Sequence, residues 1–223
     1  MRGRSKWVVA VAGLVAMSAL PRAGEAQLGV AVRGGSLGLG VDAGLALGER
    51  LVVRGGVGVL PFDITGTLDD IEMTLELPRT WYNVGVDLYL TGPMRIGAGF
   101  LFKSDDVLLS ATPTTAQDIG GQEFTPEQIG TLTGTLDNGD RAPYVLIGFG
   151  KHTASGFGLT LDLGLAFQEE TLVTLDALGG TLSDDPQFRD RLDAEEARIE
   201  NDLPTYIDLW PILSLGFRIG LGR

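Results

Sequence analysis

The sequence predicts an all-β protein: an eight-stranded antiparallel transmembrane β-barrel with one short external loop helix. Apolar residues alternate with small or polar ones over long stretches, which is the period of a β-strand. The opposing face is rich in glycine, which accounts for 33 of the 223 residues. Short and long connections alternate along the chain, as in outer-membrane barrels with short periplasmic turns and longer external loops.

The first 26 residues have the three parts of a secretory signal peptide. Basic residues precede an apolar run over residues 7–20, and small residues lie before a cleavage point after Ala26. The run is shorter than the roughly 20 residues that a helix needs to cross about 30 Å of hydrocarbon, so a membrane anchor is the weaker interpretation. We expect residues 1–26 to be a cleaved signal peptide and residues 27–223 to be the outer-membrane β-barrel domain.

Seven long strands follow from the alternation. From residue 157 to 167, for example, every odd residue is Leu or Phe, and the even residues are Gly, Thr, Asp, Gly and Ala. A shorter alternating segment at 28–33, turned by Gly34-Gly35, supplies an eighth strand, since bacterial single-chain barrels have an even number. The long strands are expected at 36–47, 51–66, 76–90, 94–113, 131–151, 157–175 and 205–221.

The glycine-rich face decides which side of each strand points outward. A soluble sandwich or barrel covers its interior with apolar side chains and exposes polar ones. Glycine has no side chain with which to cover anything, so this face suits a narrow, crowded lumen. The apolar face then points into lipid. The alternative, a secreted soluble ligand-binding β-barrel, requires the reverse assignment of every strand.

The connections predict the topology. Three short turns, near 48–50, 91–93 and 152–156, are expected to face the periplasm, and the long stretches 67–75, 114–130 and 176–204 to face outside. His152, the one histidine of the sequence, is expected to be an exposed residue of a periplasmic turn.

Charged residues on the inward faces predict a lumen charge network. An isolated charge in a narrow lumen is costly, so these groups must pair or contact water. Eight strands give an interior that side chains just fill. We interpret the network as a structural filling of the lumen; the alternative is a selectivity or gating element. Its members are Arg33, Asp42, Arg54, Asp87, Arg95, Lys103, Asp162 and Arg218.

Residues 186–203 predict the loop helix. Asp185 can cap its start, Pro186 suits the first turn, and Pro204 fits its end. We expect the apolar face of this amphipathic helix to rest on the barrel rim; the alternative is a lid or a partner-docking face. That external helix face consists of Phe188, Leu192, Ile199 and Leu203.

From Gly35 to the end, the chain resembles a family of small bacterial outer-membrane β-barrel proteins. The resemblance lies in the order of short motifs. It implies an outer-membrane barrel with no assigned activity, in contact with outer-membrane lipid and inserted by the barrel-insertion machinery. The motifs lie at 36–40, 119–125, 130–134, 142–144, 162–164, 185–188 and 210–216.

Composition excludes several function classes. Without cysteine there is no thiolate metal site or cysteine nucleophile, and with one histidine a catalytic triad is not expected. A net charge of −12 opposes a nucleic-acid partner. We therefore expect no enzyme, metal or cofactor, but a closed barrel with a structural or adhesive role, whose external partner would bind at 114–130 and 176–204. The alternative is a channel or carrier for small hydrophobic molecules.

Overall fold

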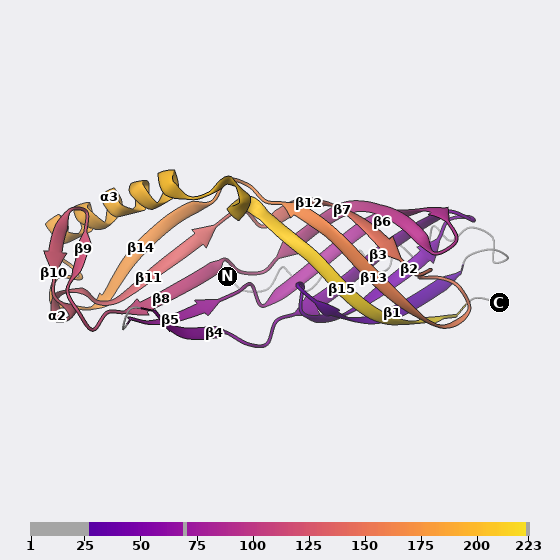
Figure 1. Ribbon diagram of the computed structural model, residues 1–223, viewed down its shortest axis with the longest axis horizontal. Helices are drawn as coiled ribbons and strands as arrows, with labels where there is room; N and C mark the ends of the chain where they lie inside the picture. Colours follow the sequence, from indigo (N-terminus) through magenta and orange to yellow (C-terminus); the bar gives the residue numbers. More distant parts are fainter. Residues whose placement is uncertain (1–26, 69–70, 222–223) are drawn as a thin grey trace, which may run out of the picture.

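The computed structural model describes residues 27–68 and 71–221, and its larger part is a closed antiparallel barrel of eight strands (Figure 1). The predicted barrel is confirmed. The segment after Gln27 forms a full strand that pairs on both sides, with β2 and with β15. The predicted signal peptide lies outside the described residues. In order around the barrel, the strands are β1 Leu28–Gly35, β15 Leu209–Gly220, β13 Gly156–Phe167, β12 Arg141–Phe149, β7 Met94–Lys103, β6 Thr80–Thr91, β3 Leu51–Val59 and β2 Leu39–Ala46.

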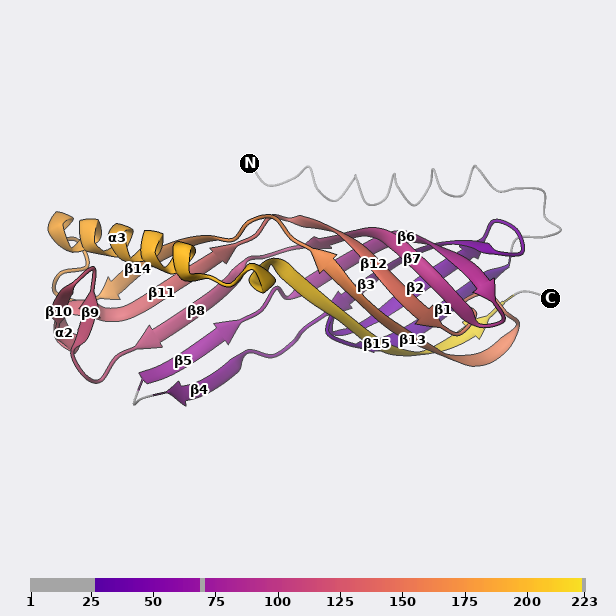
Figure 2. The same cartoon turned by 45° about the horizontal axis from the view of Figure 1, so that its top comes forward.

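A second sheet extends five of the barrel strands beyond the rim, and we call it the extension sheet (Figure 2). It corrects the prediction of uninterrupted strands at 51–66, 94–113, 131–151 and 157–175, each of which is divided in two. The predicted loop 67–75 instead contributes to a hairpin of β4 and β5. In sheet order the strands are β14 Leu172–Gly179, β11 Gly130–Asp137, β8 Val107–Thr112, β5 Ile71–Glu76 and β4 Ile64–Leu68.

The breaks at the rim coincide with residues that interrupt a strand ladder. Pro61 follows β3 and Pro78 precedes β6, and proline cannot donate a ladder hydrogen bond. Gly139, between β11 and β12, has a φ of 80°, a conformation that glycine adopts without steric cost. These residues lie within segments in which the apolar–polar alternation continues without a break. The alternation alone therefore does not indicate where the barrel strands end.

A helix covers one side of the extension sheet. The predicted helix is α3, Pro186–Asp202, and the Asp185 side chain accepts hydrogen bonds from the backbone N–H groups of Gln187 and Phe188. It packs on β14, not on the barrel rim as expected. The remaining elements are β9 Gln117–Ile119, β10 Gln122–Phe124, α2 Pro126–Ile129 and the 3₁₀ turn η1 Thr205–Asp208.

The outside of the barrel carries an apolar belt. Val145, Ile147, Leu163 and Leu213 are each 52–57% exposed although they are large and apolar. Such a continuous exposed apolar band is the lipid-facing surface of a transmembrane barrel. It contradicts the soluble ligand-binding alternative, which needs the apolar face inside. No helix among the described residues is long and apolar enough to cross a membrane.

The apolar face changes sides at the rim. Alternate residues of a strand point to opposite faces, and the odd-numbered residues of both β11 and β12 point outward. In β12 these are apolar, such as Val145 and Ile147, whereas in β11 they are Thr131, Thr133 and Thr135. The extension sheet therefore has an apolar inner face and a threonine-rich outer face.

Candidate functional site: a filled barrel lumen

Four of the predicted lumen charges meet in one buried cluster. The Asp162 carboxylate binds Arg54 Nη1 at 2.7 Å and Arg95 Nη2 at 2.5 Å through its two oxygens. Asp87 Oδ2 lies 3.2 Å from Arg95 Nε and 3.5 Å from Arg54 Nε. All four side chains are at most 5% exposed. Two cations and two anions make the cluster neutral, which is the condition under which buried charges persist.

A second, separate pair lies on the first two strands. Arg33 Nε on β1 binds Asp42 Oδ2 on β2 at 2.8 Å, and both side chains are nearly inaccessible. Arg33 Nη2 also donates a hydrogen bond of 3.3 Å to Asn83 Oδ1 on β6. The pair thus links β1 and β2 to β6, which lies beyond β3 in the barrel order.

The other two predicted charges lie at the two ends of the lumen. Lys103 Nζ binds Asp106 Oδ1 at 2.7 Å, in the break between β7 and β8. Arg218 on β15 donates to the backbone carbonyls of Ala154 and Gly156, at the turn that joins β12 and β13. The eight predicted residues are therefore all inward and paired, but they form a cluster, a pair and two end contacts, not one network.

His152 is buried, which corrects the prediction of an exposed turn residue. Only 3% of it is accessible, because the turn at 150–155 folds into the barrel mouth. Arg95 Nε donates to His152 Nδ1 at 3.3 Å, and the His152 backbone N–H donates to the Tyr89 hydroxyl at 2.9 Å. Burial, together with the positive charges of Arg95, Arg54 and Arg218, holds the pKa of His152 well below its usual value.

Glycines on neighbouring strands make room for this turn. A Cβ placed on Gly29 would lie 1.8 Å from the His152 carbonyl oxygen, and one on Gly220 would lie 1.8 Å from that of Ala154. No side chain fits such contacts, so only glycine allows the turn to enter. Inward glycines at the ends of the first and last strands were the sequence signal for a plugged mouth.

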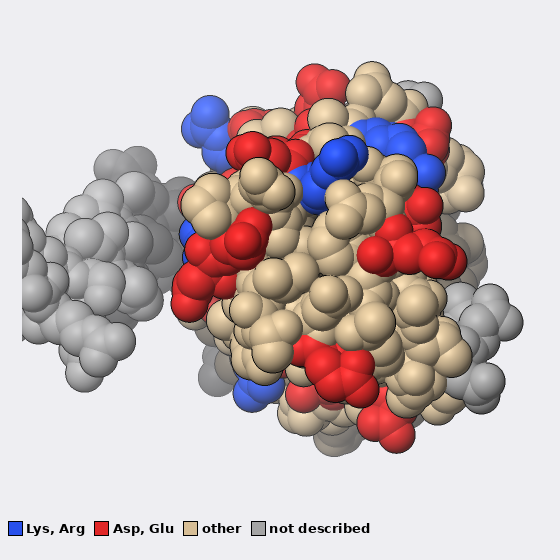
Figure 3. All heavy atoms as spheres, turned by 90° about the vertical axis from the view of Figure 1, so that its left-hand side faces the viewer, with Lys and Arg blue, Asp and Glu red and all other residues tan. Residues whose placement is uncertain are grey.

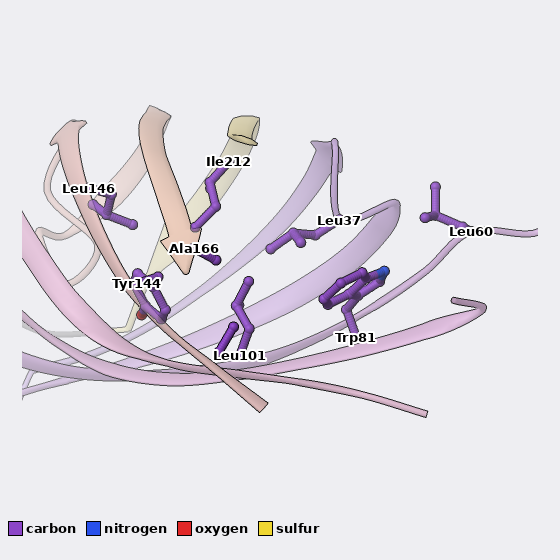
Figure 4. Packing of buried hydrophobic residues seen from close by; sticks show 9 residues of the cluster. Leu37, Leu60, Trp81, Leu101, Tyr144, Leu146, Ala166 and Ile212 are labelled. Carbon is purple, nitrogen blue, oxygen red and sulfur yellow. The ribbon is translucent and has the colours of Figure 1, made fainter. Parts of the chain in front are cut away.

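An apolar layer fills the lumen towards the rim (Figure 4). Trp81 is 1% exposed, and its ring centroid lies 4.8 Å from that of Trp210. Leu101, Tyr144 and Ile212 belong to the same cluster. The alternation marks these positions as inward, and the large side chains among them fill the lumen.

The remaining space inside the barrel is small. The cavity beside Arg33, Arg54 and Tyr144 has a volume of about 20 Å³, which is room for about one water molecule. Among residues 27–68 and 71–221, no group of three or more His, Asp or Glu side chains is arranged to hold a metal ion. The described lumen is thus a packed interior.

Comparisons with known proteins agree with this architecture. A scan against protein-family models finds no match, and a search of curated protein sequences finds none. Among solved structures, Acinetobacter baumannii CarO2 aligns with a TM-score of 0.55 at 18% identity, covering 88% of this chain and 99% of that one. A. baumannii CarO aligns with a TM-score of 0.51 at 16% identity, covering 86% and 96%.

The chain has the fold of a small outer-membrane β-barrel. Its likeness to the two CarO structures confirms the fold that the family resemblance implied. At these identities the likeness concerns the fold alone, so activity has to be argued from the residues of this chain.

The predicted external helix face is occupied within the protein. Phe188 and Leu192 are buried, and the Phe188 ring packs edge-on against Phe124 with centroids 4.8 Å apart. Ile199 and Leu203 are half-buried. The expected partner segments, 114–130 and 176–204, pack against each other in one apolar core, in which Phe188 and Leu192 are already covered.

Proposed function

We propose that the protein is a non-conducting outer-membrane barrel that anchors the extension sheet and α3 outside the cell, in a structural or adhesive role at the envelope. The filled lumen is the observation that carries this proposal. The charge cluster, the apolar layer and the inserted turn occupy successive levels of the barrel, and a cavity of about 20 Å³ between them is too small for a solute path.

The placement of the two regions follows from their surfaces. The apolar belt requires lipid, which we propose to be outer-membrane lipid, reached by cleavage of residues 1–26 and insertion by the barrel-insertion machinery. The extension sheet presents threonines on its outer face and lies opposite the short turns. Short turns face the periplasm in such barrels, so the sheet and α3 face outside. N-terminal sequencing of the membrane protein is expected to begin at Gln27.

Planar-bilayer recording tests the closed lumen. The wild-type protein is expected to show no conductance steps. A Trp81→Ala/Arg54→Ala/Arg218→Ala variant removes one side chain from each level, namely the apolar layer, the charge cluster and the anchor of the inserted turn, and is expected to conduct. Arg198→Ala, on the exposed side of α3, is the matched control and should stay silent. Conductance steps from the folded wild-type protein would contradict the proposal.

Cell adhesion tests the external role. Deleting residues 184–203 is expected to reduce attachment of expressing cells to a protein-coated surface, because the deletion removes α3 from the external surface that is proposed to make the contact. The heat-modifiability shift on a gel should persist, since the barrel strands are intact. Unchanged attachment with the barrel inserted would argue against an adhesive role.

A second candidate, binding of small hydrophobic molecules, is favoured by the inner face of the extension sheet. α3 packs on β14 at one side of this face, whereas apolar residues on β8, β5 and β4 keep some exposure, and Ile64 is 50% exposed. A fluorescent fatty-acid probe is expected to bind there and to be weakened by Leu109→Glu, but not by Thr133→Glu on the outer face. Equal binding by both variants would remove this candidate.

A further inference from the structure

The two edges of the extension sheet are treated differently. An open sheet exposes unpaired backbone N–H and C=O groups along its first and last strands. At the β14 edge, α3 supplies carboxylates to these groups: Glu200 accepts a hydrogen bond of 2.8 Å from the Val173 N–H, and Glu196 accepts one of 2.6 Å from the Leu175 N–H. This edge is therefore closed to another strand.

The opposite edge, β4, is open. β4 pairs only with β5, and within the described part of the chain no backbone hydrogen bond reaches its other side. Natural edge strands are protected by charged side chains, proline, bulges or a covering element. The sequence of β4, Ile-Thr-Gly-Thr-Leu, contains none of these protective residues.

We propose that β4 is a docking edge at which an extended, basic segment of an external partner protein adds a sixth strand to the extension sheet. This inference rests on the proposed external placement of the sheet, and it specifies the chemistry of the partner that would bind there. Strand addition obtains affinity from main-chain hydrogen bonds and specificity from alternate side chains.

The surroundings of β4 select the side chains of that segment. Ile64 lies on the apolar inner face, whereas Thr65 and Thr67 lie on the polar outer face, so the added strand should alternate apolar and polar residues. Glu72 stands opposite Thr67, and Asp63 and Glu76 share a single cation, Arg79, at 3.7 and 3.8 Å. The local excess of carboxylates favours Lys or Arg at the polar positions.

Charge also decides against a second copy of this chain as the occupant. Two β4 edges paired with each other would join two chains of net charge −12, with Asp63 beside the shared edge in each copy, and the approach of like-charged surfaces is unfavourable. Figure 3 shows acidic side chains spread around this end of the molecule, in keeping with the net charge of −12. The negative potential that repels a second copy of this chain attracts a basic strand.

Peptide binding to the folded full-length protein in detergent tests the proposal. The probe is a fluorescent seven-residue peptide, Val-Lys-Val-Thr-Val-Lys-Val, followed by anisotropy. One comparison peptide has Glu for each Lys, and another is the basic peptide N-methylated at every residue, which keeps its charge but has no backbone N–H group left to pair on either edge. We expect both comparison peptides to bind at least about tenfold more weakly.

Two double variants distinguish binding at the β4 edge from non-specific electrostatic attraction of the peptide. Thr65→Lys/Thr67→Lys places like charges on β4 and is expected to weaken the basic peptide about tenfold. Thr133→Lys/Thr135→Lys makes the same change on the same face three strands away, about 14 Å, which exceeds the screening length of about 8 Å. This control is expected to bind within about twofold of wild type.

Four outcomes would overturn the proposal: no binding by the folded protein, undiminished binding of the N-methylated peptide, equal weakening by both double variants, or dimerisation through β4 in sedimentation without peptide. The gel shift on heating and the absence of conductance are measured on the same samples. They report on the barrel alone, so loss of the docking edge and failure of the proposed closed anchor are distinguishable.

Discussion

The barrel and the extension sheet are built from the same run of strands but reverse their polarity at the rim. On β12 the outward residues, such as Val145 and Ile147, are apolar, whereas on β11 the outward residues Thr131 and Thr133 are polar. Strand pairing is antiparallel in both regions. Alternation therefore defines the two faces of a strand, and the surroundings of each region, lipid around the barrel and water around the extension sheet, determine which face is apolar.

The interiors differ as well. The barrel closes on itself and holds a neutral cluster of charges with an apolar layer. The extension sheet is open, and its inner face forms an ordinary apolar core with α3, including Phe188 and Ile129. A closed barrel has no free edge, whereas an open sheet has two, which explains why carboxylates of α3 are committed to β14.

Removing an aspartate side chain from each region in turn should give the largest difference in the free energy of unfolding. Asp162→Ala leaves Arg54 and Arg95 with one carboxylate between them, and it is expected to lower the free energy of unfolding by about 3–5 kcal/mol. Asp176→Ala, at an exposed position of β14, should change it by less than about 0.5 kcal/mol. Urea unfolding in lipid vesicles measures both. Equal small effects would show that the cluster adds nothing to stability.

Placing one charge on each outer face tests the reversal at the rim directly. Val145→Arg puts a cation into the lipid-facing belt at the middle of β12, and is expected to cost about 2–4 kcal/mol. Thr133→Arg, on the outer face of β11, meets water and should cost less than about 0.5 kcal/mol. The comparison uses the same unfolding assay. A large cost at Thr133 would mean that the extension sheet is also embedded.

Freeing the protected edge should have a smaller and local effect. Glu196→Ala removes the acceptor of the Leu175 N–H, a hydrogen bond to a charged group worth about 1.5–3 kcal/mol. Hydrogen exchange at the Leu175 amide is expected to accelerate about tenfold or more, while barrel amides stay unchanged. Glu196→Gln keeps an acceptor and should restore most of the protection. Acceleration throughout the barrel would show instead that the two regions unfold together.

The smallest effect concerns pH at the barrel mouth. The pKa of His152 is well below its usual value of about 6.5 while the turn is inserted, so protons bind more tightly when the turn is out. The inserted position of the turn is therefore fully stable above about pH 6.5. It loses stability as the pH falls from there towards the lowered pKa of His152. The charged or titratable groups that face the ring are Asp87, Tyr89, Arg54, Arg95 and Arg218.

Hydrogen exchange of residues 150–155 at pH 7.5 and pH 5, corrected for intrinsic rates, measures this effect. Exchange is expected to rise at the lower pH in the wild-type protein. His152→Gln cannot take up the proton and should lose the dependence. The same pH response in both proteins would assign it to another group.

Much of the fold could be predicted because its signals are local. The period-two pattern located the barrel strands, and Asp185 with Pro186 located the start of α3. The lumen charges were found because a charge on a glycine-rich strand face is conspicuous, as at Asp162. His152 was misplaced because nothing near it in the sequence indicates burial; the glycines that admit it, Gly29 and Gly220, lie far from it along the chain.

Local sequence patterns are enough to predict the strand period, the outward apolar face of the barrel, the set of inward charges and the capped helix, because each depends on residues within a few positions of one another. Four features emerge only from the folded chain: the position of the rim, the charges that meet, the turn at 150–155 that fills the mouth, and the protection of β14 by α3 while β4 stays open. These depend on barrel closure, which brings residues such as Arg95 and Asp162, 67 positions apart, to a hydrogen-bond distance of 2.5 Å.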